Sequence, residues 1–204
     1  MTEKQYADTL RYYAVQYECA EFTDMTLDDY PEILHVVDEW GQGGNPTVEV
    51  AEFYELTEET ARLHGCDNYD KGTFGFTRAR QKKEKEGEEE VSPSIGVVRT
   101  GNLEELHQTL AHEMIHHLEN ELNNLNEAYC QYLTVKLWEK LSPMTPDLER
   151  RVLEHLEYSK LTNMEKECGQ HDMLFLLKSY DIDLANGWTL GTTFGYHDVS
   201  DGTD

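Results

Sequence analysis

The chain has 204 residues and a formal net charge of -24 at pH 7, from 41 acidic and 17 basic side chains. So strong a negative balance argues against nucleic-acid backbones and anionic membranes as partners, because like charges repel. It fits a protein that charge keeps in solution, or one adapted to high salt, where a Debye length of about 3 Å at 1 M screens self-repulsion. We favour a halophilic host.

The cysteines and the first residues indicate the compartment. Cys19, Cys66, Cys130 and Cys168 lie far apart and form no CxxC pair. We expect them to be reduced and mostly buried as small apolar side chains. The first residues, MTEKQYADTL, lack the basic and apolar regions of a signal peptide, and no apolar run reaches the roughly 18 residues of a membrane span. These features predict a soluble cytoplasmic protein.

The first half of the chain predicts helices followed by strands. A capping box of Thr2 and Gln5 opens a helix at 3–19, and a second helix is expected at 27–40. The sequence GQGGNP at 41–46 ends this part. Strand candidates follow at 47–56, 72–79 and 94–100, with a short capped helix at 57–65 and a solvated charge run at 80–90.

After residue 100 the pattern becomes helical. Asn102 can cap a helix at 103–122, with Glu105 completing a capping box, and Asn123–Asn124 breaks that helix. Further helices are predicted at 125–141, 147–161 and 163–180. The Gly-rich tail at 186–204 offers Trp188, Phe194 and Tyr196 as side chains that can dock on the rest of the protein.

The helix predicted at 103–122 has two different faces. His112 and His116 lie one turn apart, so both imidazoles can bind one metal ion. Glu113 projects between these histidines and the apolar flank, where it can touch a water bound to the ion instead of ligating the ion. The opposite side carries an apolar stripe that we expect to enter the core, formed by Leu103, Leu106, Leu110, Met114, Leu118 and Leu122.

The residues 112–116 read His-Glu-x-x-His, a pattern typical of zinc hydrolases. Zn²⁺ held by three protein ligands keeps a position for water and lowers the pKa of that water towards about 7. Glu113 would accept the proton as general base and later return it as acid. Because the chain has nine histidines, the motif can also arise by chance, which would leave an acidic domain without a metal.

The stretch TLAHEMIHHLEN followed by LNEAY resembles the active-site helix and the next, glutamate-bearing helix of zincin metallopeptidases of the gluzincin kind. The resemblance covers about residues 94–141. It implies an α+β, zincin-like fold, in which a small sheet packs against the active-site helix and further helices lie outside. It also implies a strand beside the substrate just before that helix, a place that SIGVVRT at 94–100 matches. The implied activity is zinc-dependent hydrolysis of a protein or peptide.

The third zinc ligand is open between two residues. Glu127 is the first choice, because the resemblance implies an acid from the next helix and a buried carboxylate there needs a cation. Its spacing from His116 is shorter than in common gluzincins, and it can also be an ordinary glutamate at a helix start. His171 is the alternative, since with Phe175 it loosely matches the third-histidine pattern of SprT-like zincins. Asp172 can instead orient a ligand histidine.

We predict one zincin-like domain, comprising N-terminal helices at 1–45, the sheet and active-site helices at 46–141, C-terminal helices at 142–185 and the tail. His117 points nearer the apolar stripe and is expected to be structural. An enzyme that hydrolyses amides also needs an oxyanion stabiliser; the candidates are Tyr129, Tyr132 and Tyr196. The alternative function is a non-catalytic binding protein of the same fold with a structural or vestigial metal site. The sequence does not indicate the oligomeric state.

Overall fold

The computed structural model describes residues 1–9, 51–70, 72–79, 81, 91–99, 102–122, 127–161 and 171–195. Within these ranges the side chains at 118, 121–122, 127–130, 132 and 155–161 are not described. The predictions for 27–40 and for 41–46 therefore lie outside the described residues. The chain divides into two compact units, Met1–Asn126 and Glu127–Asp204, and each is described by itself. The single domain stays a prediction.

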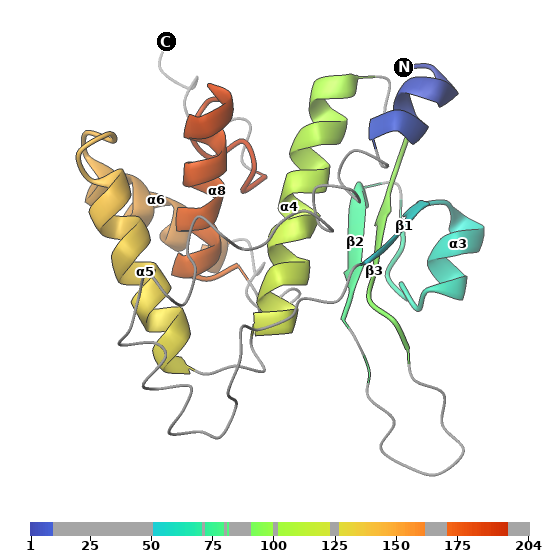
Figure 1. Cartoon of the computed structure of the whole chain (residues 1–204), viewed down its shortest axis with the longest axis horizontal. Coiled ribbons are helices and arrows are strands. Elements are labelled where there is room, and N and C mark those ends of the chain that lie inside the picture. The colour runs from blue at the N-terminus through green and yellow to red at the C-terminus, as the bar shows by residue number, and fades with distance from the viewer. Residues whose placement is uncertain are drawn as a thin grey trace. The chain divides into compact units, whose positions relative to one another are not determined.

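The first unit contains a sheet of three strands in the order β1-β3-β2 (Figure 1). The strands are β1 at Glu52–Glu55, β2 at Gly75–Arg78 and β3 at Ser94–Val97. β3 pairs with β1 in parallel and with β2 in antiparallel orientation. Strands therefore form within all three predicted segments, and with the helices they confirm the α+β class.

The position of β3 corrects one expectation. Both edges of this strand are paired, so SIGVVRT is not the strand that can run beside a substrate. All four residues of β3 are buried, whereas those of β2 are only partly buried, and burial on both faces is typical of a central strand. Among the described strands, β2 is the antiparallel edge.

Two helices cover opposite faces of this sheet (Figure 1). On one face, α4 at Leu103–Leu122 lies along β2 and β3. The apolar cluster on that face consists of Tyr6, Ala51, Ile95, Val97, Leu106 and Leu110. On the other face, the cluster around α3 at Glu58–Leu63 consists of Leu56, Ala61 and Cys66. Full burial of one such aliphatic side chain stabilises the fold by about 1.5–3 kcal/mol.

α4 occupies the range predicted for it. The Asn102 side chain accepts a hydrogen bond from the backbone N–H of Glu104 at 2.9 Å, as expected of a capping residue. Leu106 and Leu110 of the predicted stripe are completely buried, and Met114 packs against them. Leu103, the first residue of the helix, remains 38% exposed. The apolar stripe therefore fixes which face of α4 meets the sheet.

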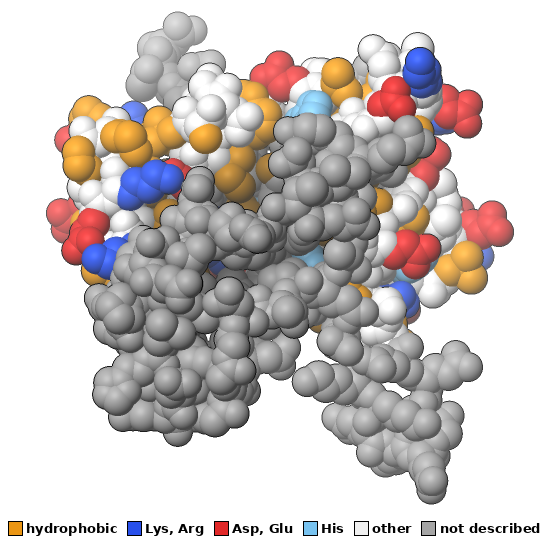
Figure 2. Space-filling model, in the orientation of Figure 1, with side chains coloured by type: hydrophobic (Ala, Val, Ile, Leu, Met, Phe, Trp, Pro, Cys, Tyr) orange, Lys and Arg blue, Asp and Glu red, His pale blue; other side chains and the backbone are white. Residues whose placement is uncertain are grey.

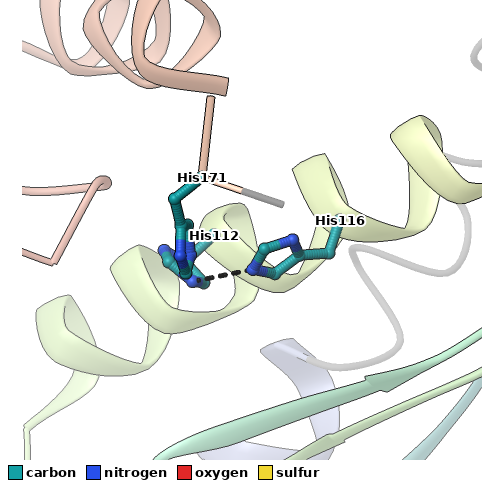
Figure 3. A group of neighbouring side chains, drawn as sticks. All are labelled: His112, His116 and His171. Carbon is teal, nitrogen blue, oxygen red and sulfur yellow. Dashed lines mark hydrogen bonds between the residues drawn. The ribbon is translucent and has the colours of Figure 1, made fainter. Parts of the chain in front are cut away.

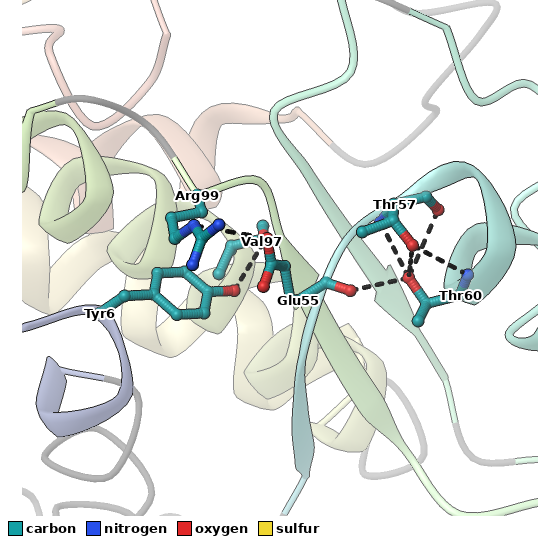
Figure 4. Close-up of polar contacts among 6 residues, drawn as sticks. All are labelled: Tyr6, Glu55, Thr57, Thr60, Val97 and Arg99. Carbon is teal, nitrogen blue, oxygen red and sulfur yellow. Dashed lines mark hydrogen bonds and ion pairs between the residues drawn. The ribbon is translucent and has the colours of Figure 1, made fainter. Parts of the chain in front are cut away.

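The start of the chain is helical at residues 3–9. The predicted capping box is present, since Thr2 Oγ1 accepts from the N–H of Gln5 at 3.2 Å and the N–H of Thr2 donates to Gln5 Oε1 at 2.9 Å. The Tyr6 hydroxyl donates to the carbonyl of Val97 at 2.8 Å, which ties this helix to the end of β3 (Figure 4). The rest of the helix predicted at 3–19 lies outside the described residues.

α3 confirms the short capped helix predicted at 57–65. Thr57 and Thr60 form a reciprocal cap, in which the side chain of each accepts from the backbone N–H of the other (Figure 4). Gly65 follows the helix with a φ of 76°, a left-handed conformation that glycine adopts without strain. The adjacent Cys66 is a free, buried thiol, as predicted for it.

On the same face of the sheet, an aromatic side chain lies against bare backbone. A Cβ added to Gly96 would lie 2.4 Å from Cζ of Tyr54, so the Tyr54 ring fits only because residue 96 is glycine. His64 stacks on Tyr54, with ring centroids 3.8 Å apart and planes at 9°, and its Nδ1 lies 3.1 Å from Ser94 Oγ. Burial lowers the pKa of His64, so this ring is neutral near pH 7.

The second unit contains helices α5 at Glu127–Leu141, α6 at Leu148–Leu161 and α8 at Met173–Asn186. α8 packs against both α5 and α6. The prediction of a helix at 163–180 is wrong for residues 171 and 172, which are not helical, and for its end, since α8 continues to Asn186; residues 163–170 lie outside the described part. Asp172 is the N-cap of α8 and accepts from the N–H of Phe175 at 2.9 Å, while Gly187, with a φ of 69°, ends the helix. The capping residues set these ends, because apolar periodicity alone does not locate termini.

The segment after α8 is held by a buried carboxylate. Asp183 accepts hydrogen bonds from the N–H of Gly191 at 2.7 Å and from the N–H and Oγ1 of Thr193 at 3.0 and 2.6 Å. Phe194 is completely buried, which confirms its predicted docking, whereas Tyr196 lies outside the described residues. This Asp183 network keeps the chain compact beyond its last described helix.

Two further observations concern the helices and the surface of the described residues. In the described part of the chain, no helix combines the length and the apolar character needed to cross a bilayer. On the face drawn in Figure 2, acidic side chains are spread over the described surface, with apolar ones between them.

Candidate metal centre

His112 and His116 lie on successive turns of α4, as their spacing predicted (Figure 3). Their Nε2 atoms are 3.1 Å apart, and their ring planes meet at 79°. In a tetrahedral zinc site with Zn–N distances of 2.0–2.1 Å, two ligand nitrogens are about 3.3 Å apart. His116 is buried and His112 is partly buried. The pair therefore presents two nitrogens at the separation that one ion requires.

His171 completes a group of three possible ligands. One ligand nitrogen from each of His112, His116 and His171 lies within 4.8 Å of the others (Figure 3). The His171 ring is buried and packs edge-on against Phe175, at a centroid distance of 4.7 Å, and against Phe194 at 5.7 Å. Three imidazoles form a donor set that suits zinc and several other transition metals. The three side chains can therefore hold a metal ion.

Other residues predicted for the site are not tested. Glu127 is the first residue of α5, but its side chain lies outside the described part, so its role as the third ligand stays a prediction. The same holds for the oxyanion candidates Tyr129, Tyr132 and Tyr196.

Two other residues named from the sequence have described surroundings. Asp172 is the N-cap of α8, where its side chain accepts a hydrogen bond from the N–H of Phe175. His117 is completely buried, as expected of a structural residue.

Glu113 lies against the sheet and is 6% exposed. Its Oε2 is 2.7 Å from Oγ1 of Thr77 in β2, and the same hydroxyl lies 2.9 Å from the backbone carbonyl oxygen of Glu113. Burial raises the pKa of Glu113 to about 7, although the hydrogen bond from Thr77 opposes this rise. The carboxylate is not among the three grouped ligands in the described part of the chain. Its proton affinity suits a group that exchanges protons near neutral pH.

β2 leaves room for this carboxylate. A Cβ added to Gly75 would lie 2.4 Å from Oε1 of Glu113 and 2.7 Å from its Cδ. Gly75 and Thr77 are two residues apart in one strand, so both face the same side of the sheet. Neither residue was singled out from the sequence, because Thr77 precedes Glu113 by 36 positions and no local pattern links them. The only signal was their alternation within a predicted strand.

Comparison with known proteins adds no relative. No protein-family model, curated protein or solved structure matches this chain. Its class is therefore defined by its own fold and side chains, as an α+β protein with a three-histidine group that can hold a metal ion.

Proposed function

We propose that the chain is a zinc-dependent metallopeptidase of the zincin type, in which His112, His116 and His171 hold Zn²⁺ and Glu113 is general base and later acid. The grouping of the three histidine nitrogens is the observation that carries this proposal. Catalytic zinc sites use three protein ligands and keep a further position open. His171 thus takes the role for which Glu127 was the first choice, and Glu127 remains the alternative.

The chemistry follows from the neighbours of Glu113. A zinc ion in such a site acts as a Lewis acid and makes water nucleophilic near neutral pH. Glu113 would take the proton of the attacking water and pass it to the leaving amine. Burial keeps this carboxyl protonated to about pH 7, whereas a nearby cation favours its ionised form. Glu113 would therefore be ready to accept a proton when the metal is present.

The proposed substrate is a protein or peptide in extended form. In the described part of the chain, β2 pairs on one side only, and Glu113 lies against this strand. An edge strand offers backbone N–H and C=O groups to an incoming extended chain. We therefore assign to β2 the substrate-side role that the resemblance had suggested for SIGVVRT.

Metal analysis and one substitution test the activity. We expect the purified protein to contain zinc and to cleave an unfolded protein such as casein. Glu113→Gln should keep the zinc and lower kcat by about 10²–10⁴-fold, the usual contribution of general acid-base catalysis. Zinc retention without wild-type cleavage of any unfolded substrate would contradict the peptidase, and absence of zinc would contradict the metal site.

A pair of matched variants identifies the third ligand. His171→Ala should lose stoichiometric zinc, whereas Glu127→Gln should retain it. Both proteins should keep their helical circular dichroism, which serves as the control for folding. The opposite pattern, with zinc lost only in Glu127→Gln, would return the ligand role to Glu127.

A structural metal site in a non-catalytic protein is the second candidate. The burial of Glu113 favours it, because a base that is 6% exposed and bonded to Thr77 must gain access to substrate before it acts. Structural zinc is fully coordinated and contributes directly to folding. In that case, removal of zinc would unfold the protein, and Glu113→Gln would change no activity.

A further inference from the structure

The strand β2 is shaped around the carboxylate of Glu113. We propose that Thr77 is a positioning residue for Glu113, and that Gly75 provides the space in which the carboxylate lies. This inference rests on the proposed role of Glu113 as general base. Both residues belong to an edge strand that precedes the His-Glu-x-x-His helix in the sequence, so their contact with Glu113 comes from the fold and not from the spacing within that motif.

Thr77 holds both the side chain and the backbone of Glu113. Its Oγ1 is 2.7 Å from Oε2 and 2.9 Å from the carbonyl oxygen of the same residue. The β-branch of threonine restricts χ1, so the hydroxyl keeps one direction. A glutamate side chain has several rotatable bonds, and a contact at its end removes much of that freedom. Thr77 therefore fixes the orientation of the group that would move the proton.

Gly75 has no side chain, and this leaves the space that the Glu113 carboxylate occupies. An added methyl would overlap the carboxylate, since the Cβ position is 2.4 Å from Oε1, 2.6 Å from Cγ and 2.7 Å from Cδ of Glu113. Gly75 is not among the residues with positive φ, so alanine is compatible with its backbone. A substitution there would displace Glu113 without straining the strand.

The first test separates kcat from KM. Thr77→Val, which removes the hydroxyl at nearly constant shape, should retain zinc and KM and lower kcat about 10–100-fold. Thr77→Ser keeps a hydroxyl and should recover most of this loss. Gly75→Ala should also lower kcat without loss of zinc. A wild-type kcat in Thr77→Val would overturn the proposal.

The second test needs no enzymatic activity. In metal-free protein, Thr77→Val should lower Tm in the wild-type background and lower it less in a Glu113→Ala background, because part of the contact is already gone. Thr73→Val is the matched control, since its hydroxyl bonds to Asp70 in the turn before β2. Its effect on Tm should be the same in both backgrounds. Equal effects of Thr77→Val in both backgrounds would overturn the proposed hold on Glu113.

The two proposals fail in different ways. Zinc-loaded wild type that cleaves no unfolded protein overturns the proposed function, whatever the Tm values show. If the wild type is active, either full kcat in Thr77→Val or the absence of coupling to residue 113 overturns the positioning role and leaves the proposed function standing.

Discussion

At the scale of single residues, Glu113 connects burial to proton binding. It is a carboxyl in the core, and burial raises its pKa to about 7. Such a group binds its proton more tightly in the native protein than in the unfolded chain. The stability of the metal-free protein must therefore depend on pH through this residue.

The sign of this pH dependence follows from the two pKa values. The unfolded carboxyl titrates near 4.5 and the native one near 7, so the native state binds more protons between these limits. Relative to Glu113→Gln, wild type should have its full stability below pH 4.5 and lose about 3 kcal/mol as the pH rises through 7. Urea unfolding of both proteins in chelator, from pH 4 to 8, measures the difference. Parallel curves would show that the native protein does not raise the pKa of Glu113.

The spacing of single residues predicted only half of the candidate site. His112, Glu113 and His116 could be identified because one turn of helix brings residues four apart together. Thr77 and Gly75 could not, since a strand and a helix separated in sequence meet only through the fold. His171 was the alternative ligand only because, with Phe175, it loosely resembles the third-histidine pattern of SprT-like zincins; the Phe175 ring contacts the His171 ring.

At the scale of helices and strands, three helix starts follow from local signals, whereas the caps of α8 and the central place of β3 were not predicted. The caps of Thr2, Thr57 and Asn102 each involve neighbours in sequence, so the sequence alone was enough to locate them. The central place of β3 depends on two strands that come from distant parts of the chain. Alternation within one strand carries no information on which strands lie beside it.

The N-cap of α8 provides a prediction at this scale. Asp172 directly follows His171, so the cap also fixes the end of the chain segment that bears this ligand. Asp172→Ala should lower the free energy of unfolding by about 1 kcal/mol, as is usual for the loss of an N-cap. Asn is an equally good cap, so Asp172→Asn should stay near wild type. Equal losses in urea unfolding for both variants would point to the charge instead of the hydrogen bond.

At the scale of the whole molecule, the net charge of -24 is the property that bears most directly on stability in salt. Repulsion among these charges opposes the compact state, and salt reduces it as the Debye length falls to about 3 Å at 1 M. This excess of acidic over basic groups is a property of composition and was evident before the fold.

Thermal unfolding at increasing salt tests the effect of this charge. We expect Tm of the metal-free protein to rise between 0.05 and 2 M NaCl, by roughly 2–4 °C for each 1 kcal/mol of repulsion removed. Sucrose solutions of equal osmolality serve as the control, because they leave electrostatic forces nearly unchanged. A Tm that is flat or falls with salt would argue against both self-repulsion and adaptation to a saline host.

The ring of Tyr54 over Gly96 has a consequence for how the sheet assembles. If β3 slipped by two positions, Ser94 or Val98 would come beneath the ring, and neither offers the bare backbone that the ring requires. A slip by one position would exchange the two faces and turn Ile95 and Val97 away from α4. The fit of the Tyr54 ring against Gly96 therefore favours one register of β1 against β3, because a shifted register would place a side chain where the ring lies.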